Sequence, residues 1–309
     1  MHMKGINEID SRIIGSLRDL EKGEGEFSRS ARVYREVLQI QMEAKVSATV
    51  VRPNLSEDLV RERLREGIPL LPFEDFHPDW KQVQAVSKQI IAHVVGDFEV
   101  SLEMYDDLRN IGSDVGFLRE AAEVWYRGLS LERVSIARTG DVELLASVVG
   151  ATLKPFLSAY SESLYPGIDQ ELWRRNYCPV CGGKPDFSSL KEGGTRWLFC
   201  SRCDGEWLFL RMECPYCGTR NQEALAYFTI EEKPGLYRLY VCEECHTYLK
   251  GIDSRLSGEE VLLPLERVLT LDLDRQGRER GYEPGWTTRK GTEGSSHGPA
   301  EEEKERRAN

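Results

Sequence analysis

The eight cysteines of this chain constrain its fold more than any other feature. All of them fall within residues 178–245 of the 309-residue sequence, in four Cys-x-x-Cys pairs separated by 18, 10 and 24 residues. A two-residue gap lets both sulfurs of a pair reach one ion, so two such pairs fill the four positions of a tetrahedral metal site. Paired in order along the chain, the cysteines predict two closed four-thiolate centres.

The predicted ligand sets follow directly from this pairing. The first site has the spacing C-x2-C-x18-C-x2-C and the second has C-x2-C-x24-C-x2-C. The ligands of the first site are Cys178, Cys181, Cys200 and Cys203, and those of the second are Cys214, Cys217, Cys242 and Cys245. An interleaved arrangement, in which the first and third pairs share an ion, stays open. Thiolate-only tetrahedral sites suit both zinc and iron, so the residues alone do not choose the metal.

The residues around the cysteines favour metal knuckles, although to different degrees. In Cys178-Pro-Val-Cys-Gly and Cys214-Pro-Tyr-Cys-Gly, proline follows the first cysteine and glycine follows the second. Proline fixes φ and glycine tolerates positive φ, and a tight knuckle uses both properties. The other two pairs have Asp204 and His246 in the glycine position and are less ideal. Each predicted site therefore joins one ideal knuckle to one poorer partner.

Other uses of the thiols fit the sequence less well. The N-terminal segment lacks the apolar core of a signal peptide, and no stretch approaches 18 uninterrupted apolar residues. We therefore expect a cytoplasmic protein without a membrane span, in which thiols stay reduced and clustered cysteines bind metal. A thioredoxin-like redox pair normally occurs once, and four regular pairs suit single ions better than an iron–sulfur cluster.

The sequence offers little that could perform catalysis. Neither predicted metal site keeps an open position for a substrate, because cysteines occupy all four positions. The five histidines form no motif with carboxylates, and the sequence contains no phosphate-binding glycine loop or nucleophile elbow. We therefore expect a protein that is not an enzyme and has no catalytic residues.

The charge balance argues against a ribbon that binds nucleic acid. The chain has a net charge of −11, and residues 171–253 carry eleven Lys and Arg against twelve Asp and Glu. Binding to nucleic acid needs a positive footprint. A ribbon-type nucleic-acid-binding protein therefore remains only a secondary hypothesis.

Hydrophobic periodicity predicts an α-helical region followed by a small β region. Residues 1–170 are expected to form an all-helical domain, 171–255 a double four-cysteine ribbon, 256–283 a closing C-terminal helix and 284–309 a disordered tail. The expected helices are Phe27–Val51, Glu57–Glu66 with Ser56 as N-cap, Asp79–Asn110, Asp114–Gly128, Asp141–Tyr165 and Leu265–Arg280. The expected strands are Thr195–Phe199, Glu206–Met212, Leu225–Ile230 and Leu236–Val241, with a turn at Lys233-Pro-Gly between the last two. A proline-broken connector after Gly67 is expected to pack its apolar side chains, Leu70, Leu71, Phe73 and Phe76, against the helices.

The strand Glu206–Met212 offers a candidate partner surface. Alternation places Trp207, Phe209 and Arg211 on one face of this strand and Leu208, Leu210 and Met212 on the other. We expect the aliphatic face to be core, which leaves the aromatic face toward the helical domain or toward a partner. Packing between the domains is one interpretation. Partner binding, with Arg202 included, is the other, because Trp and Arg are enriched at interface hot spots.

The sequence around the knuckles has a specific residue order. It contains Cys178-Pro-Val-Cys-Gly-Gly-Lys-Pro, the run from Leu198 to Gly218 with Glu206-Trp207, and Val241-Cys-Glu-Glu-Cys-His-Thr-Tyr-Leu-Lys. Over residues 175–282 this order resembles the FdhE-type formate dehydrogenase accessory (formation) protein family.

The resemblance implies a helical N-terminal domain joined to a rubredoxin-like double ribbon. It also implies a cytoplasmic factor that matures respiratory formate dehydrogenases containing molybdenum or tungsten. Such a factor engages the catalytic subunit before export, and iron is favoured over zinc at its two sites. The leading hypothesis is thus an assembly factor, and the alternatives are a rubredoxin-like electron carrier and the nucleic-acid-binding ribbon.

Overall fold

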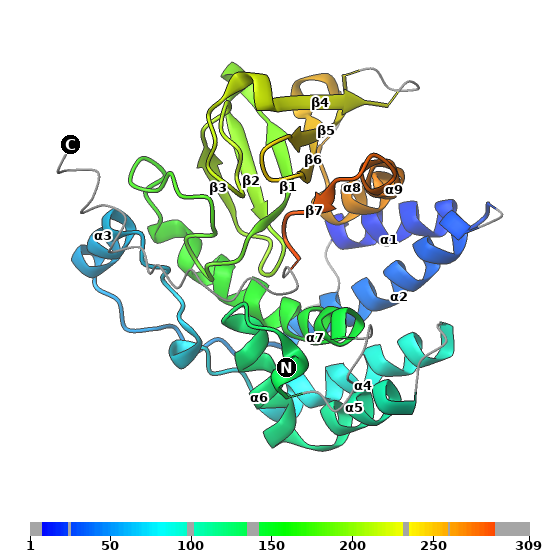
Figure 1. The fold of residues 1–309 in the computed structure, drawn as a ribbon. Coiled ribbons are helices and arrows are strands. Elements are labelled where there is room, and N and C mark those ends of the chain that lie inside the picture. The colour runs from blue at the N-terminus through cyan, green and yellow to red at the C-terminus, as the bar shows by residue number, and fades with distance from the viewer. Residues whose placement is uncertain are drawn as a thin grey trace.

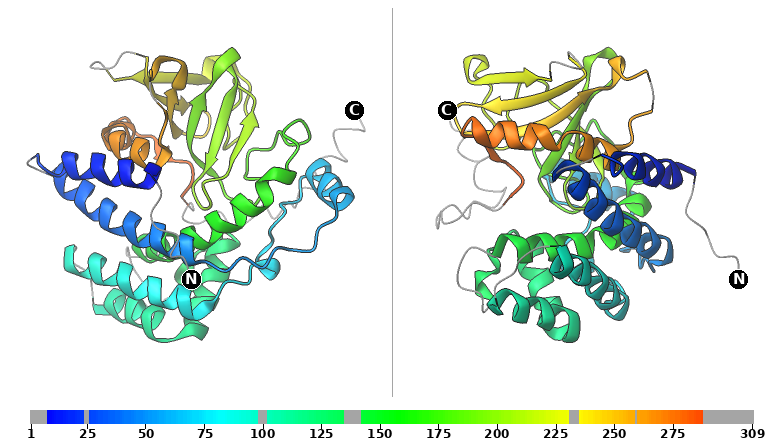
Figure 2. Two further views of the ribbon diagram at one scale, coloured as in Figure 1. Left: turned by 180° about the vertical axis from the view of Figure 1, so that it is seen from behind. Right: turned by 90° about the vertical axis from the view of Figure 1, so that its right-hand side faces the viewer.

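A computed structural model describes residues 8–23, 26–97, 102–134, 142–230, 235–258 and 260–287 of the chain. A helical layer lies on one side and a twisted sheet on the other, with two short C-terminal helices beside the sheet (Figure 1). The views from behind and from the side show the same two layers (Figure 2). The predicted fold class, a helical N-terminal region joined to a four-cysteine sheet module with a closing helical segment, is confirmed.

The helical layer contains the first seven α-helices. They are α1 (Glu8–Leu20), α2 (Glu26–Ser47), α3 (Glu57–Glu66), α4 (Trp80–Asp97), α5 (Leu102–Ser113), α6 (Val115–Tyr126) and α7 (Val142–Leu164). The short 3-10 turns in the described chain are η1 (Phe73–Asp75), η2 (Leu131–Arg133), η3 (Tyr165–Gly167), η4 (Glu192–Gly194), η5 (Gln222–Ala224) and η6 (Ser254–Leu256). The predicted start of α3 is confirmed, because the Ser56 hydroxyl accepts a hydrogen bond from the Leu59 N–H at 3.2 Å.

Helix α7 is the centre of the helical layer. Its buried side chains include Leu145, Leu153 and Phe156, and it packs against α2, α4 and α6. Trp125 of α6 lies so close to Gly150 that a Cβ there would come within 2.9 Å of the indole ring. Residues 142–167 are long and apolar enough to cross a membrane, but half of the most apolar window is buried inside the protein. Packing within the helical layer therefore accounts for the apolar composition of this helix.

The sheet consists of two similar halves. Its strands are β1 (Pro185–Leu190), β2 (Arg196–Cys200), β3 (Glu206–Phe209), β4 (Leu225–Thr229), β5 (Tyr237–Cys242), β6 (Thr247–Asp253) and the short β7 (Glu283–Pro284). The strand order is β3-β2-β1-β6-β5-β4, and β7 pairs with β6. Each half is an antiparallel three-stranded ribbon, and the parallel pairing of β1 with β6 joins the halves. In each half, one cysteine pair precedes the first strand, and the other begins at the last residue of the second strand, Cys200 or Cys242, and continues into the turn before the third.

Two different layers cover the two halves of the sheet. The first half shares one continuous core with the helical layer, which includes Leu198 and Trp207 on the sheet side and Leu153 and Tyr160 on the helical side. The second half packs one face against α8 (Leu263–Leu269) and α9 (Leu271–Glu279), where Leu273 contacts the core of β5 and β6. Helix α1 packs on both α2 and α8, so the N-terminal helix also contacts the closing helices.

Several predicted elements differ from the observed ones. The helix predicted over Asp79–Asn110 is two helices, α4 and α5, and residues 98–101 between them lie outside the described chain. The closing helix predicted over Leu265–Arg280 is divided at Thr270, where the hydroxyl donates to the Glu266 carbonyl at 2.7 Å and the backbone leaves the helical region. Helix α1 and strands β1, β6 and β7 were not predicted, and β7 extends to Pro284, the first residue of the predicted tail. Most of the predicted tail and the first two residues of the turn at Lys233-Pro-Gly lie outside the described residues.

Candidate metal centres

The structure brings together the thiols of the first predicted site. The Sγ–Sγ distances are 3.5 Å between Cys178 and Cys203, 3.4 Å between Cys181 and Cys200, and 3.5 Å between Cys181 and Cys203. Four sulfurs bound at about 2.3 Å to one ion lie about 3.8 Å apart in a regular tetrahedron. A slight expansion of the observed cluster therefore accommodates one zinc or iron ion.

The second cluster has the same form. The Sγ–Sγ distances are 3.7 Å between Cys214 and Cys245 and 3.6 Å between Cys217 and Cys242. The Thr247 hydroxyl lies 2.9 Å from the Cys245 sulfur. Among the described residues, these two cysteine clusters are the sets of His, Cys, Asp or Glu side chains close enough together to hold a metal ion. The clusters join the first pair with the second and the third with the fourth, so the structure has the sequential arrangement and not the interleaved one.

All four knuckles use the same backbone turn. The residue after the second cysteine has a positive φ in each one: 69° at Gly182, 57° at Asp204, 75° at Gly218 and 50° at His246. The first cysteine of a knuckle donates its N–H across the turn, as Cys178 does to Gly183 at 2.8 Å and Cys200 does to Gly205 at 2.9 Å. The two knuckles that look less ideal in sequence therefore adopt the same turn without glycine.

The two clusters differ in their exposure to solvent. All four cysteines of the first cluster are buried, whereas Cys217 of the second is exposed and Cys245 is half-buried. Burial raises the pKa of the Cys178 thiol, and its hydrogen bonds with the other three cysteines of the cluster raise it further. A hydrogen bond from the Cys214 thiol lowers the pKa of Cys245 to about 4, against the opposing effect of burial. The first cluster thus lies inside the core, and the second opens to solvent on one side.

The first knuckle is attached to the connector from the helical region. The Leu70 N–H donates to the Pro179 carbonyl at 2.9 Å, and the Leu71 N–H donates to the Val180 carbonyl at 2.8 Å. Both leucines are fully buried, and Phe73 and Phe76 are buried as well, so the predicted packing of the connector is confirmed. This connection holds the first metal site against the helical layer.

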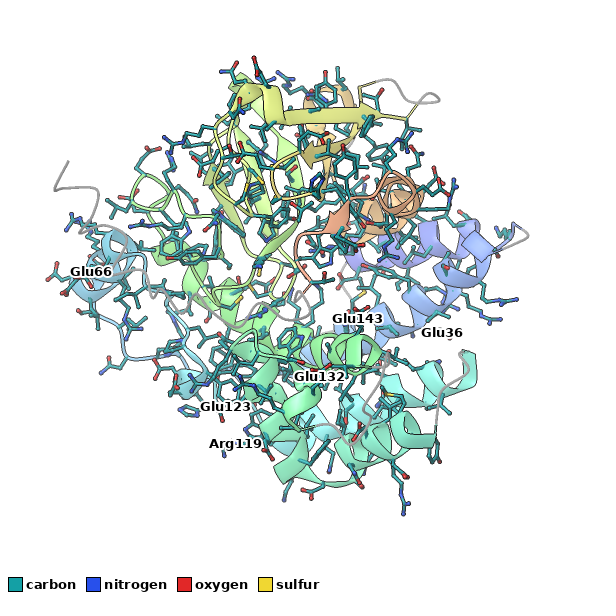
Figure 3. All side chains as sticks on the ribbon, viewed as in Figure 1. Glu36, Glu66, Arg119, Glu123, Glu132 and Glu143 are labelled. Carbon is teal, nitrogen blue, oxygen red and sulfur yellow. The ribbon has the colours of Figure 1, made fainter. Side chains whose placement is uncertain are left out.

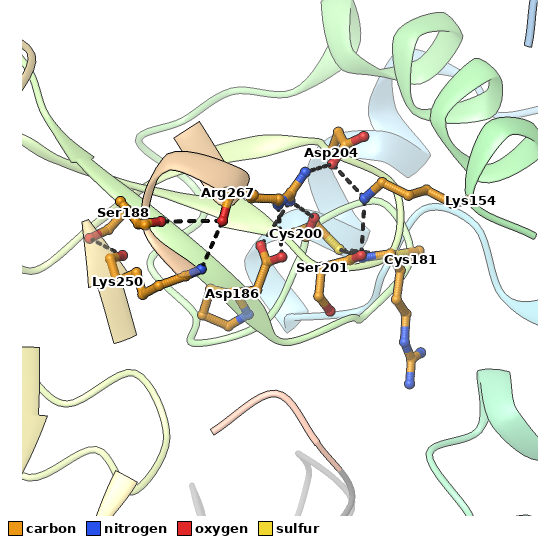
Figure 4. A network of polar contacts seen from close by, with 12 residues as sticks. Lys154, Cys181, Asp186, Ser188, Cys200, Ser201, Asp204, Lys250 and Arg267 are labelled. Carbon is orange, nitrogen blue, oxygen red and sulfur yellow. Dashed lines mark hydrogen bonds and ion pairs between the residues drawn. The ribbon is translucent and has the colours of Figure 1, made fainter. Parts of the chain in front are cut away.

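A network of ion pairs attaches the second knuckle to three other elements (Figure 4). One carboxylate oxygen of Asp204 lies 2.7 Å from Lys154 Nζ of α7 and 2.6 Å from Arg267 Nη1 of α8. The Arg267 guanidinium also makes a bidentate pair with Asp186 of β1 at 2.8 Å and donates to the Cys200 carbonyl at 3.2 Å. Asp204 therefore links the first metal site to the helical layer and to the closing helices. Sequence reasoning missed this role, although an aspartate in a glycine position was a visible signal.

The residues predicted to bind a partner lie in two different environments. Trp207 is fully buried and donates its Nε1–H to the Arg175 carbonyl at 2.9 Å, and Phe209 is also buried. The Arg202 guanidinium lies 4.7 Å from the centre of a Trp125 ring and donates to the backbone carbonyls of α6. These three side chains pack between the sheet and the helical layer, and Arg211 alone of the four is exposed.

The prediction that the aliphatic face of Glu206–Met212 forms core is wrong. Leu210 is 39% exposed and Met212 is 48% exposed, whereas the aromatic face is buried. The reason is that β3 ends at Phe209 and presents Trp207 and Phe209 to the core shared with the helical layer. This arrangement leaves Leu210 and Met212 at the surface, and Met212 lines a pocket together with Cys214 and Cys242 of the second cluster.

The acidic side chains of the helical layer are spread over separate elements. Figure 3 labels Glu36 of α2, Glu66 of α3, Glu123 of α6, Glu132 of η2 and Glu143 of α7. The Glu36 carboxylate lies 3.1 Å from His93 Nδ1, and His246 is exposed beside the second cluster.

Comparison with known proteins gives the family. The profile "FdhE, central domain" matches residues 177–211, which contain the first cysteine cluster. A protein from Aquifex aeolicus, named "Protein FdhE homolog", is 33% identical over 235 residues, which cover 74% of this chain and 76% of that protein. This chain belongs to the FdhE family. "Protein FdhE" of Escherichia coli K12 is 28% identical to the chain over 172 residues, which cover 49% of this FdhE family member and 55% of the E. coli protein.

A solved structure of the FdhE family has the same fold. The crystal structure of the FdhE protein from Pseudomonas aeruginosa superimposes with a TM-score of 0.63 and covers 94% of this chain and 99% of that chain. The sequence identity is only 20%. The FdhE fold, with its helical layer and two-part sheet, is therefore retained although most residues differ.

Proposed function

We propose that this FdhE family protein is a cytoplasmic accessory factor that binds the catalytic subunit of respiratory formate dehydrogenase during its maturation. The observation that carries the proposal is the family membership, which includes a profile match at the knuckle residues 177–211. The closed geometry of both cysteine clusters supports a factor that binds and not an enzyme, because four thiolates leave a metal no position for substrate. The acidic composition supports a protein partner in place of nucleic acid.

The metal centres would act by folding the module that presents the partner surface. Each ion would cross-link two knuckles that are distant in sequence, and metal-binding free energy is then folding free energy. Cys178, Cys181, Cys200 and Cys203 would hold the first ion, and Cys214, Cys217, Cys242 and Cys245 the second. Iron is favoured by the family resemblance, and zinc is the alternative. When bound, either ion supplies a rigid tetrahedral centre.

The experiment that tests this function uses a deletion strain and the native partner. Formate dehydrogenase activity should be lost in anaerobic cells without the gene and restored by the full chain. The catalytic subunit should co-purify with the tagged chain from anaerobic extract. Unchanged activity in the deletion strain, with no catalytic subunit recovered, would contradict the proposal.

The exposure of the second cluster favours one alternative, a rubredoxin-like electron carrier. Cys217 lies at the surface, so an iron ion at this site could exchange electrons with a partner without opening the fold. The discriminating measurement is voltammetry of the iron-loaded protein, combined with its reduction in a reductase assay. A reversible potential with turnover would favour the carrier, and the absence of turnover would favour the assembly factor.

We also propose the division of the chain into a helical domain over 1–170, a metal module over 171–255, a closing segment over 256–283 and a tail over 284–309. The continuous core between α7 and the first half of the sheet implies that the first two parts resist separation. Limited proteolysis should remove the tail first and leave one resistant body. Early cleavage inside residues 80–97 or 142–164 would contradict this division.

A further inference from the structure

A pocket lies beside the second cysteine cluster, between the second half of the sheet and residues 211–216. Its volume is about 170 Å³. The pairing of the strands places Tyr227, Tyr240 and Leu249 in one row across β4, β5 and β6, and these residues form the floor. A cavity of about 150 Å³ admits a benzene molecule. The pocket therefore has room for one aromatic ring or one branched aliphatic side chain.

Arg196 in the wall of this pocket is a buried cation that pairs with no carboxylate of the described residues. Only 4% of the residue is exposed, and its guanidinium lies 4.8 Å from the centre of the Tyr240 ring. Nη1 donates to the Arg211 and Glu213 carbonyls at 3.4 and 3.2 Å, and the buried Nε has no partner. Within the described ranges no ion pair joins this guanidinium to a carboxylate, and burial lowers its pKa. A buried charge is costly unless an opposite charge compensates it, so a ligand anion at this wall would be stabilised.

The other charges around the pocket strengthen this conclusion. Among the described residues that line the pocket, the acidic one is Glu213. Its carboxylate already pairs with Arg220 at 2.6 Å. Arg238 pairs with Asp253 at 2.9 Å, and the same carboxylate also pairs with Arg255 at 2.6 Å. Arg211 is exposed at the rim and adds a further positive charge. The pocket is thus locally cationic on a chain with a net charge of −11.

The rim of the pocket has the features of a peptide-binding edge. Met212 is 48% exposed and Tyr227 is 52% exposed, and both line the pocket. In the part of the chain that the structure describes, β4 forms one end of the sheet, so its outer N–H and C=O groups can pair with an added strand. Addition of a peptide strand to a sheet edge uses main-chain bonds for affinity and pockets for specificity.

We propose that this pocket binds an extended acidic peptide segment of the client protein, with a carboxylate at Arg196 and Arg211 and a neighbouring apolar side chain in the cavity. The identification of the client as the formate dehydrogenase catalytic subunit rests on the proposed function. Cys214 and Cys242 belong to both the pocket and the second cysteine cluster. The four cysteines of the second cluster, when they hold a metal ion, would therefore fix the wall of the pocket against its floor.

The test uses the full, metal-loaded chain and overlapping peptides that cover the catalytic subunit. Binding of each peptide is measured by fluorescence anisotropy, and binding of the purified subunit is measured in parallel. Arg211→Ala and Tyr227→Ser should each weaken the best peptide about tenfold, because each removes one anchor. Replacing the glutamate or aspartate of that peptide by its amide should have a similar effect.

Matched controls separate the pocket from general surface effects. Tyr105→Ser changes a tyrosine of α5 that is 48% exposed, and Arg275→Ala changes an arginine of α9 whose side chain is 63% exposed. Both should leave the affinity within about twofold of wild type. Arg196→Gln should abolish binding, with metal content and thermal unfolding measured to verify that the fold is kept.

The outcomes distinguish the pocket from the proposed function. If the subunit binds wild type, Arg211→Ala and Tyr227→Ser equally well, the pocket proposal is overturned and the accessory function stands. If the purified subunit does not bind but one of its acidic peptides binds with the expected losses, the pocket is supported as an acidic-peptide site, and the catalytic subunit is overturned as the client. Peptides that bind no better than their amide versions, or an inorganic phosphate that binds where no peptide does, would also overturn the pocket.

Discussion

Glycine substitutions at Asp204 and His246 separate the effect of the backbone conformation on stability from the effect of the side chain, because both residues occupy the same position of their knuckles. Both residues have left-handed backbone, with φ of 57° and 50°, where the other two knuckles have Gly182 and Gly218. A residue with a Cβ pays about 1–2 kcal/mol of conformational free energy in this conformation, and glycine does not. The greater flexibility of glycine in the unfolded chain cancels about half of the stability gained by the substitution. The backbone alone therefore predicts a gain of about 0.5–1 kcal/mol in the free energy of unfolding at both positions.

The lost side-chain interactions reverse the sign of the predicted stability change at Asp204 but not at His246. The Asp204 carboxylate accepts from Lys154 and Arg267, whose side chains are 17% and 9% exposed. Each charged hydrogen bond contributes about 1.5–3 kcal/mol, and the lower value applies because Arg267 keeps its pair with Asp186. Asp204→Gly should therefore destabilise the protein by about 2 kcal/mol net. His246 is exposed, with its ring 6.4 Å from that of Tyr282, so His246→Gly should stabilise by about 0.5 kcal/mol.

The assay is thermal unfolding at equal metal content. At about 2 °C per kcal/mol for a chain of this size, Asp204→Gly should lower Tm by about 4 °C and His246→Gly should raise it by about 1 °C. A Lys154→Met variant, alone and combined with Asp204→Gly, measures the coupling between the two side chains. The reasoning is refuted if both glycine variants shift Tm in the same direction, or if the double variant shows no coupling.

The remaining predictions concern the metals and the packing between layers. A chelator should remove the ion of the second site first, because Cys217 is exposed. Cys217→Ser should leave one ion in a folded chain, whereas Cys178→Ser should unfold the module. Simultaneous loss of both ions to the chelator would contradict this order. The raised pKa of Cys178 means that its metal-free thiol holds a proton at neutral pH, so metal affinity is full above that pKa and falls as the pH is lowered. Calorimetry in buffers of different ionisation enthalpy should detect the release of protons when metal binds. The absence of proton release would refute this prediction. Arg202→Ala removes two hydrogen bonds and a cation–π contact with α6. It should lower the free energy of unfolding by about 2 kcal/mol at unchanged metal content. Loss of metal in this variant would contradict a role of Arg202 in packing alone.

The metal ligands could be predicted from sequence because their signal is local and regular. Each knuckle needs only two cysteines and a tight turn, and the spacing along the chain identifies the pairs. The Ser56 cap of α3 was predictable for the same reason, since all its determinants lie within one turn.

The interactions that join the layers could not be predicted in this way. Asp204 meets Lys154 and Arg267, which lie 50 and 63 residues away in sequence. Strand β6 is buried at every position, including Lys250, which is neutralised by Asp274 at 2.6 Å. A strand covered on both faces has no alternation of polar and apolar residues. Its parallel partner β1 is also distant in sequence, since Phe187 pairs with Lys250. The buried face of β3 was predicted wrongly because the position of the helical layer, and not the composition of either face, decides which face is core.

The most direct test of this account is the metal content and coordination of the anaerobically purified chain. We predict two ions per chain by elemental analysis, and X-ray absorption at the metal edge should show four sulfur neighbours at about 2.3 Å around each ion. A red protein with thiolate-to-iron charge-transfer bands would identify iron, and a colourless metal-loaded protein would identify zinc. One ion or none per chain, or nitrogen and oxygen neighbours in place of sulfur, would contradict the two closed four-thiolate centres on which the proposed function depends.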